Sequence, residues 1–272
     1  MKYELFLSDF DGTLVRADGT ISEKNIQTIT DYRKKGGVFA IVTGRMPSSI
    51  LPRLKELGIS EGLVVSYQGA TVTDIKTGVM LKDDGFTPEN TLKALRVLED
   101  MELHIHVYTL ENFYCNMDDE ALRLYEKVCR VKAIIIQDEL LSEKIEREKL
   151  RIVKLLSIVP IEDRDKVKVA VQKALGPEFS VTCSSRHFVE VLPAHVSKAN
   201  AVHYLADYYH IPIGRVAAIG DQLNDLPMIM AAGGKFAVGN AVSELKEIAT
   251  VVPSVEEDGV AVALGYAMED NR

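Results

Sequence analysis

The sequence predicts an α/β protein: a doubly wound, Rossmann-like core of parallel strands, interrupted by an inserted α+β domain. Both ends of the chain alternate short apolar runs with amphipathic segments, whereas the pattern changes between about residues 83 and 187. A strand–helix–strand alternation implies right-handed crossovers and a parallel sheet covered on both faces. We therefore expect residues 1–82 and 188–272 to form the core, and residues 83–187 to form the insertion.

The N-terminal part of the core opens with a buried strand over residues 3–8. A helix is expected over residues 22–35, because Ser22 suits the N-cap position and Gly36 follows the helix end. Two apolar runs flank the turn-rich residues 74–78 and predict a hairpin. The other elements expected before the insertion are strands over 38–42 and 63–66 and a helix over 47–57.

The insertion is expected to hold four helices and four or five strands. A strand over 188–192 either closes this unit or leaves it. The expected helices cover residues 88–101, 118–130, 140–148 and 161–175, and the expected strands cover 104–109, 112–115, 152–158 and 179–182.

The core pattern returns after Pro193. We expect a helix over 197–209, a strand over 216–219, a helix over 225–232 and a strand over 236–238, with the same alternation continuing over 243–248 and 250–252. In open sheets of this kind, ligands bind beyond the carboxyl ends of the strands, where the strand order reverses.

Bulk properties exclude several classes of protein. A net charge of −8 argues against a duplex-wrapping nucleic-acid binder, which needs a basic face. No apolar run approaches the roughly 18 residues of a membrane span, and no signal-peptide core is present near the N-terminus. The three cysteines fit neither a C-x-x-C site nor a disulfide framework. These observations predict a cytoplasmic protein with no membrane partner, and they leave the oligomeric state open.

Two carboxylates follow the first strand directly, in Asp9-Phe10-Asp11-Gly12-Thr13. Residues two apart on an extended chain point the same way, so both carboxylates can face one site. Such a pair repels unless a cation binds between the two groups or one keeps a proton. The alternative is an acidic loop that caps the next element.

Two further signals suit a phosphate group. Thr43-Gly44-Arg45 follows the second strand, where a hydroxyl and an unobstructed backbone N–H can meet phosphate oxygens. Lys198 stands at the start of a helix, which the helix dipole disfavours unless an anion lies beside it. The alternatives are an ordinary strand-to-helix turn and a solvated surface lysine.

Gly220-Asp221-Gln222-Leu223-Asn224-Asp225 follows a strand of the returning core. Asp225 could simply cap the next helix, but that explanation leaves Asp221 and Asn224 unexplained. Carboxylates combined with a backbone carbonyl, phosphate and water suit Mg²⁺.

Together these four segments resemble the haloacid dehalogenase (HAD) superfamily of phosphotransferases, whose motifs run D-x-D-G-T, T-G-R, Lys and G-D-x-x-N-D in this order. The place of the insertion is similar to the Cof-like subgroup with a type IIB cap. Residues 238–241 and 257–260 also resemble that subgroup's C-terminal pattern. The likeness covers essentially the whole chain.

The resemblance implies a Mg²⁺-dependent phosphatase that acts on small phosphorylated metabolites through an aspartyl-phosphate. Asp9 would be the nucleophile and Asp11 the general acid and base. Mg²⁺ would be held by the Asp9 carboxylate, the Asp11 backbone carbonyl and Asp221. The implied phosphate-binding residues are Thr43, Gly44, Arg45, Lys198 and Asn224, with Asp225 as a supporting residue.

Three departures from the family pattern concern the loops around the phosphate. Gln68 replaces the usual asparagine, and His195 and Ala199 replace common glycines near the lysine. Three other functions stay open: a phosphosugar mutase, a receiver-like signalling switch and a phosphate-binding scaffold. Arg186 is a candidate for contacting the substrate.

No second metal site is predicted. His104 and His106 face one side of an expected strand, but two alternating histidines without a third ligand are typical of core or surface positions.

Overall fold

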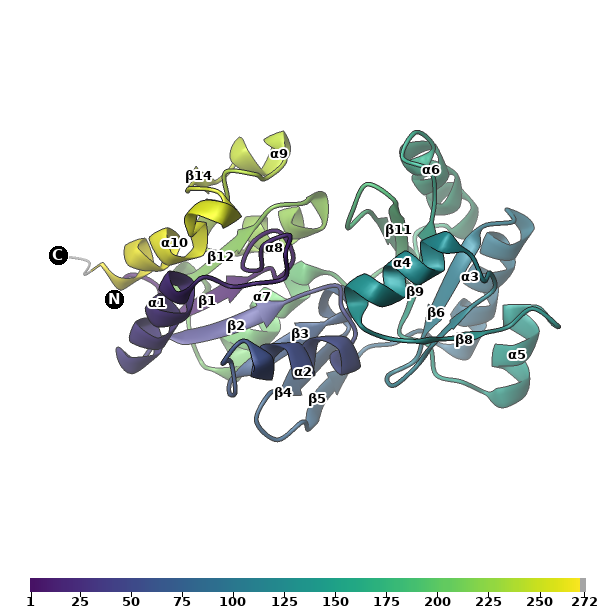
Figure 1. The fold of residues 1–272 in the computed structure, drawn as a ribbon, viewed down its shortest axis with the longest axis horizontal. Coiled ribbons are helices and arrows are strands. Elements are labelled where there is room, and N and C mark those ends of the chain that lie inside the picture. The colour runs from purple at the N-terminus through teal and green to yellow at the C-terminus, as the bar shows by residue number, and fades with distance from the viewer. Residues whose placement is uncertain (270–272) are drawn as a thin grey trace. The chain divides into compact units, whose positions relative to one another are not determined.

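The computed structural model describes residues 1–269 and divides the chain into two compact units (Figure 1). The first unit contains residues 1–44 and 53–81 and the C-terminal part from Ser197 onward. The second unit contains residues 45–52 and 82–196. Among the described residues, none of the helices has both the length and the apolar character that crossing a bilayer requires.

The first unit is built on an eight-stranded sheet with the order β14-β13-β12-β1-β2-β3-β4-β5. Neighbours from β14 to β3 are parallel, and β4 runs antiparallel to β3. The predicted doubly wound parallel sheet is therefore confirmed. The strands are β1 (Leu5–Ser8), β2 (Val38–Val42), β3 (Leu63–Ser66), β4 (Thr71–Asp74), β5 (Met80–Asp83), β12 (Val216–Gly220), β13 (Gly234–Ala237) and β14 (Thr250–Val251).

Strand β1 lies at the point where the strand order reverses. Leu5 is paired with Val38 of β2 on one side and with Val216 of β12 on the other. The strands next to β1 therefore come from opposite ends of the chain. The apolar side chains of β1 are fully buried on both faces of the sheet, as expected for a covered parallel strand. The carboxyl ends of β1 and β12 form the crevice in which such sheets bind ligands.

Helices from both ends of the chain cover this sheet. In Figure 1 the purple α1 (Glu23–Lys34) lies against the yellow α10 (Gly259–Met268). The predicted N-cap of α1 is confirmed, because the Ser22 hydroxyl accepts a hydrogen bond from the Asn25 N–H at 3.1 Å. Helix α10 was not predicted, since a uniformly apolar segment has no amphipathic period. Helix α2 (Pro47–Glu56) has residues in both units, because residues 47–52 group with the second unit and residues 53–56 with the first. The other helices of the first unit are α7 (Lys198–Tyr208), α8 (Leu226–Ala231) and α9 (Ser243–Lys246). Short 3₁₀ turns lie at Tyr67–Gly69, Ile213–Arg215, Leu223–Asp225 and Val255–Glu257.

The second unit is an α+β domain on a six-stranded sheet with the order β10-β11-β9-β6-β7-β8. Helix α3 packs against α5 and α6. Strand β8 was not predicted. The strands are β6 (His104–Tyr108), β7 (Phe113–Cys115), β8 (Ala133–Ile135), β9 (Lys154–Ile158), β10 (Phe179–Thr182) and β11 (Phe188–Pro193), and the helices are α3 (Pro88–Asp100), α4 (Glu120–Cys129), α5 (Leu141–Glu148) and α6 (Arg164–Leu175).

The predicted boundary at residue 188 is wrong. Strand β11 pairs antiparallel with both β9 and β10, and so belongs to the second unit. The physical reason is burial, because Val189 and Val191 are fully buried in the hydrophobic core of that unit. Residues 45–52 also group with the second unit, which the sequence did not indicate.

Candidate active site

Two strand ends bring the predicted acidic residues together in the first unit. Asp9 follows the last residue of β1, and its backbone N–H donates to the Ile219 carbonyl of β12 at 3.0 Å. Asp221 directly follows β12. The parallel pairing of the two strands thus sets these side chains at one edge of the sheet. This edge is the carboxyl edge, where the sequence predicted the site.

A buried ion cluster holds this edge together. The Lys198 ammonium donates to Asp9 Oδ1 and, at 2.5 Å, to Asp225 Oδ1. Lys198 is the first residue of α7, and its side chain is completely buried. The backbone at Gly69 lies close to the start of this helix. A Cβ on Gly69 would be 2.2 Å from the Ser197 carbonyl oxygen, so only glycine allows this approach. The sequence suggested an anion beside this lysine, and the structure places the Asp9 and Asp225 carboxylates there.

Asp225 occupies the N-cap position of α8, but its side chain does not cap this helix. Its side chain makes no capping hydrogen bond to α8. Instead, Asp225 Oδ2 accepts from the backbone N–H groups of Asp221 and Gln222 at 2.9 and 3.0 Å, while Oδ1 meets Lys198. A Cβ at Gly220 would lie 2.5 Å from the Asp225 Cβ, so a glycine is required there. Asp225 therefore links the β12 turn to the lysine.

The D-G-T segment closes around Asp221. Thr13 Oγ1 donates to Asp221 Oδ1 at 2.8 Å. Gly12 has a φ of +79°, and a Cβ there would lie 2.8 Å from Asp221 Oδ2. Glycine is thus needed both for the left-handed backbone and for the close approach of the carboxylate.

The electrostatics of the cluster follow from burial and repulsion. Burial raises the pKa of Asp9 well above its usual range, the Asp225 carboxylate adds to this rise, and Lys198 opposes it. Burial and the Asp225 charge raise the pKa of Asp221 to about 6. Burial alone would lower the pKa of Lys198, but Asp225 and Asp9 raise it. The pKa values of Asp9 and Asp221 therefore rise chiefly because of burial, and the neighbouring Asp225 carboxylate adds to the rise.

The cluster fits a hard divalent cation. Oxygen atoms of Asp9, Asp221 and Asp225 all lie within 4.8 Å of one another, and all three residues are buried. When all three carboxylates are ionised, as cation binding requires, three carboxylates less one ammonium leave an excess of two negative charges. A divalent cation with oxygen ligands would balance that excess, and oxygen ligands are the donors such ions prefer.

Comparison with known proteins identifies the family. A family model for the haloacid dehalogenase-like hydrolases matches residues 6–264. The chain belongs to this family. YkrA of Bacillus subtilis is 32% identical over 97% of both chains. YwtE of Bacillus subtilis, which its name describes as a 5-amino-6-(5-phospho-D-ribitylamino)uracil phosphatase, is 29% identical over 93% of this chain and 94% of its own.

The fold of a solved family member agrees. A haloacid dehalogenase-like hydrolase from Bacillus subtilis superposes with a TM-score of 0.88 at 24% identity, over 97% of this chain and 99% of the other. The resemblance found in the sequence is confirmed, and so is the prediction of an enzyme of the phosphoric monoester hydrolase class.

The second family carboxylate, Asp11, is not one of the three clustered carboxylates. Its side chain is exposed, and its backbone forms an isolated bridge with Val15. The Gly12 N–H donates to the Val15 carbonyl at 3.0 Å, which closes a turn over residues 12–15 directly after the second carboxylate of the motif. Asp9 is thus buried and Asp11 exposed, although only one residue separates them.

The T-G-R segment of the family motif is divided between the two units, with Thr43 and Gly44 in the first and Arg45 in the second. Thr43 is buried directly after β2, and its carbonyl accepts from the Gln68 N–H at 3.0 Å. A Cβ on Gly44 would lie 2.5 Å from Gln68 Nε2. Arg45 belongs to the second unit, as do His195 and Arg186, and the last two are exposed. The remaining departure, Ala199, is half-buried in the first turn of α7.

Gln68, the departure from the family's asparagine, has a defined place. It is buried and left-handed, with φ 60° and ψ 20°. Its Oε1 accepts from Asn224 Nδ2 at 3.0 Å, while Asn224 Oδ1 is buried without a hydrogen-bond partner. Asn224 therefore keeps one acceptor for a further donor, and Gln68 links the loop after β3 to the loop after β12.

Four positioning residues were not predicted. Besides Thr13, Asn240 donates from Nδ2 to the Gly12 carbonyl at 2.8 Å and accepts at Oδ1 from the Val255 N–H at 2.9 Å. Arg16 forms an ion pair with Asp258 at 3.1 Å. Asn240 and Asp258 lie in the two C-terminal segments that resemble the subgroup pattern, so that resemblance was the available signal. Together these contacts fasten the D-x-D-G-T loop to the C-terminal part of the first unit.

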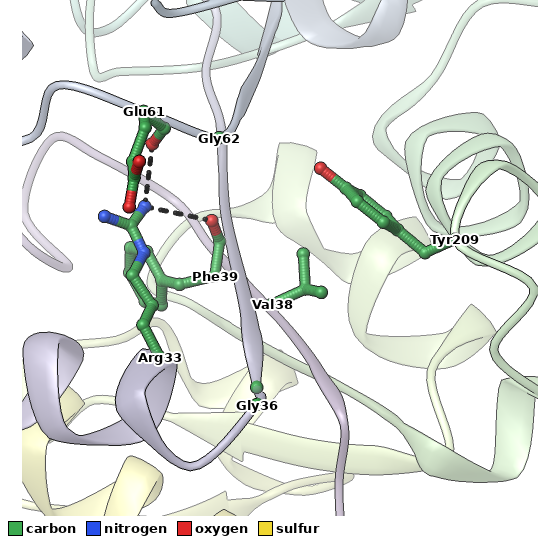
Figure 2. Close-up of a pocket in the computed structure, with 8 residues that line it drawn as sticks. Arg33, Gly36, Val38, Phe39, Glu61, Gly62 and Tyr209 are labelled. Atoms are coloured by element: carbon green, nitrogen blue, oxygen red, sulfur yellow. Dashed lines mark hydrogen bonds between the residues drawn. The ribbon is translucent and has the colours of Figure 1, made fainter.

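Another pocket lies at the opposite end of the strands. It has a volume of about 340 Å³ and lies beside Val38, the first residue of β2. Figure 2 shows residues that line it. The Arg33 guanidinium donates to the Glu61 carbonyl at 2.9 Å and to the Phe39 carbonyl at 3.4 Å. No predicted site residue lines this pocket, which separates it from the candidate active site.

Proposed function

We propose that the chain is a Mg²⁺-dependent phosphatase that hydrolyses small phosphorylated metabolites through an aspartyl-phosphate on Asp9. The observation that carries this proposal is the buried cluster at the carboxyl ends of β1 and β12. There, one lysine contacts Asp9 and Asp225, and a third carboxylate, Asp221, lies within 4.8 Å of both.

The first step would be attack of an Asp9 carboxylate oxygen on phosphorus. The new O–P bond forms as the bond from phosphorus to the leaving alcohol oxygen breaks, and Asp11 gives that oxygen a proton. In the second step Asp11 takes a proton from water, and the water oxygen displaces the Asp9 carboxylate from phosphorus. The exposure of Asp11 suits this role, because its carboxyl group can exchange protons with solvent between the steps.

Mg²⁺ would be held by the Asp9 and Asp221 carboxylates and by the Asp11 backbone carbonyl. When bound, the ion supplies positive charge that offsets the repulsion between an anionic nucleophile and a phosphate. The gathering of three buried carboxylates around a single ammonium supports this assignment. Asp225 is a supporting residue, since both of its oxygens are occupied by Lys198 and by backbone N–H groups.

The transferring phosphoryl group would be bound by Lys198, the Thr43 hydroxyl and the Gly44 N–H, with the Asn224 side-chain N–H and Arg45 as further donors. Charge develops on these oxygens during transfer, so fixed donors aimed at them lower the barrier. Asn224 is linked to Gln68, which supports a role for this amide in shaping the phosphate-side loops.

We propose the first unit as the catalytic core and the second as a type IIB cap that selects the leaving group. Sugar phosphates and phosphorylated cofactors are the proposed substrates. The named substrate of YwtE, a ribityl compound that carries a phosphate, supports this class. A mutase or a receiver-like switch would use the same core, and the test below separates them from hydrolysis.

The test is a screen of phosphorylated metabolites for phosphate release with and without Mg²⁺, in which wild type is compared with Asp9→Asn and Asp18→Asn. Asp18 is an exposed aspartate of the same unit and serves as the matched control. We expect Mg²⁺-dependent release that falls by at least about 10³-fold in Asp9→Asn and is unchanged in Asp18→Asn. Equal release by wild type and Asp9→Asn would contradict the mechanism, and phosphoryl transfer without release would favour the mutase or the switch.

A further inference from the structure

The second unit contains a buried group of nitrogen and sulfur donors. His104 and His106 lie on one face of β6, two residues apart, and Cys115 ends the neighbouring β7. The antiparallel register pairs His106 with Cys115. Side chains of directly paired residues lie on the same face of a sheet, so all three converge. His106 and Cys115 are completely buried, and His104 is 7% exposed.

The distances within this group match a metal centre. His104 Nε2 lies 3.1 Å from His106 Nε2 and 3.2 Å from Cys115 Sγ, and the three donor atoms all lie within 4.8 Å of one another. Zinc binds histidine nitrogen at about 2.0–2.1 Å and cysteine sulfur at about 2.3 Å in a tetrahedron, which places such ligand atoms about 3.3–3.6 Å apart. Small side-chain shifts would bring the group to that geometry.

The other ring nitrogens have the partners that metal-bound histidines use. His104 Nδ1 lies 3.1 Å from Asp119 Oδ2, and His106 Nδ1 lies 3.2 Å from the Tyr108 hydroxyl. Hydrogen bonds from Nδ1 fix the ring and direct the lone pair of Nε2 to a metal. The Tyr125 ring packs against His106 with centroids 4.7 Å apart, which further holds the imidazole. Both Nε2 atoms are thus oriented toward a common point.

Asp119 has two separate tasks, one for each oxygen. Its Oδ1 accepts from the Leu122 N–H at 2.8 Å and caps α4, while Oδ2 faces His104. The helix cap therefore holds the carboxylate beside the histidine. An asparagine would keep the cap but lose the charge, since asparagine caps helices as well as aspartate does.

We propose that His104 Nε2, His106 Nε2 and Cys115 Sγ form a second metal site, specific for Zn²⁺ and distinct from the aspartate cluster. Binding forms two Zn–N bonds and one Zn–S bond, and the Cys115 thiol releases its proton to solvent. The three protein ligands leave the fourth tetrahedral position to water. Nitrogen and sulfur donors favour Zn²⁺ over Mg²⁺, which prefers oxygen. The site would join β6, β7 and the start of α4.

The same contacts could instead be a metal-free chain of hydrogen bonds from Asp119 through both histidines to Tyr108. The experiment that separates the two is titration of the chelator-treated, reduced full-length protein with Co²⁺, with excess Mg²⁺ added to compete for the aspartate cluster. A tetrahedral Co²⁺–thiolate centre has charge-transfer and visible absorption bands. We expect these bands to saturate at one equivalent and to be displaced by Zn²⁺. Their absence would overturn the proposal.

Matched variants assign the bands to residues. In Cys115→Ala the charge-transfer band should vanish, whereas in Cys129→Ala and Cys183→Ala it should persist. Asp119→Asn should weaken Zn²⁺ affinity by about 10- to 100-fold. Asp118→Asn is the control, because Asp118 is the adjacent residue and its side chain is equally exposed, at 44% against 43%. Bands that survive Cys115→Ala, or equal Zn²⁺ affinity in the Asp119 and Asp118 variants, would contradict the site.

Discussion

The aspartate cluster of the first unit and the His104–His106–Cys115 cluster of the second unit are both buried, yet they differ in donor chemistry. The first contains three carboxylates and a lysine, which carry an excess of two negative charges when all three carboxylates are ionised. The second contains two imidazoles and a thiol, which are uncharged when neutral imidazoles and a protonated thiol are present. The first therefore suits a hard cation held partly by charge, and the second a softer cation held by coordinate bonds.

The two clusters also differ in how the chain assembles them. In the first unit each contributing residue follows the end of a different strand or begins a helix, so a motif marks each position in the sequence. In the second unit the third ligand comes from a neighbouring strand, and only the pairing of His106 with Cys115 brings it into place. Motifs at strand ends can thus be read from a sequence, whereas a site on the face of a hairpin depends on register.

The largest expected difference between the clusters follows from Asp221→Ala. We expect kcat/KM to fall by about 10³-fold and the response to Mg²⁺ to disappear, because the variant loses a carboxylate ligand. Co²⁺ absorption at the second cluster should be unchanged. Parallel activity assays and Co²⁺ titrations check this. Loss of the Co²⁺ bands in Asp221→Ala would show that the two clusters are not independent.

A second variant, Lys198→Met, changes the charge of the first cluster only. Removing the ammonium leaves Asp9 and Asp225 buried without it, which should lower the free energy of unfolding of the metal-free protein by about 3–5 kcal/mol. Activity should fall by about 10²- to 10³-fold. Because the negative excess grows, Mg²⁺ should stabilise the variant more than it stabilises wild type.

Denaturant unfolding with EDTA and with Mg²⁺ measures that difference. Lys198→Arg is the control that keeps the charge but not the geometry, so it should restore the smaller Mg²⁺ stabilisation without restoring activity. Equal Mg²⁺ stabilisation of wild type and Lys198→Met would contradict the charge account of the first cluster.

The smallest expected effect belongs to Gln68→Asn. The shorter amide would lose its hydrogen bond to Asn224, which is worth about 0.5–1.5 kcal/mol, so kcat/KM should fall by about threefold to tenfold. The free energy of unfolding should fall by no more than the value of that hydrogen bond, because asparagine tolerates a left-handed backbone. Steady-state kinetics measures the fall in kcat/KM. Co²⁺ binding at the His104–His106–Cys115 cluster should be unchanged. A fall beyond about 100-fold would mean that Gln68 contacts the substrate itself.

Much of the fold and of the first cluster was predictable from the sequence. Alternating strands and helices indicated the doubly wound core, and the acidic residues after β1 and β12 indicated the edge of the sheet. The predictions that failed depended on contacts between distant residues. Phe188–Pro193 looks like a core strand until its pairing with β9 and β10 is known.

Side-chain partners could not be predicted for the same reason. Asp225 has the sequence context of a helix cap, but the structure gives it Lys198 and two backbone N–H groups instead. Cys115 is one of three scattered cysteines in the sequence, and its relation to His104 appears only when β6 and β7 pair. Local patterns report local structure, whereas these roles are set by residues far along the chain.

The central claim, that Asp9 becomes phosphorylated, is tested most directly by trapping the intermediate. Asp11→Ala lacks the proposed base for the second step, so a phosphorylated substrate with a good leaving group should leave one phosphoryl group on the protein. Intact mass spectrometry should show that addition, and peptide mapping should place it on Asp9. Unmodified Asp11→Ala protein that nevertheless releases phosphate with Mg²⁺, or a phosphoryl group on another residue, would contradict the account.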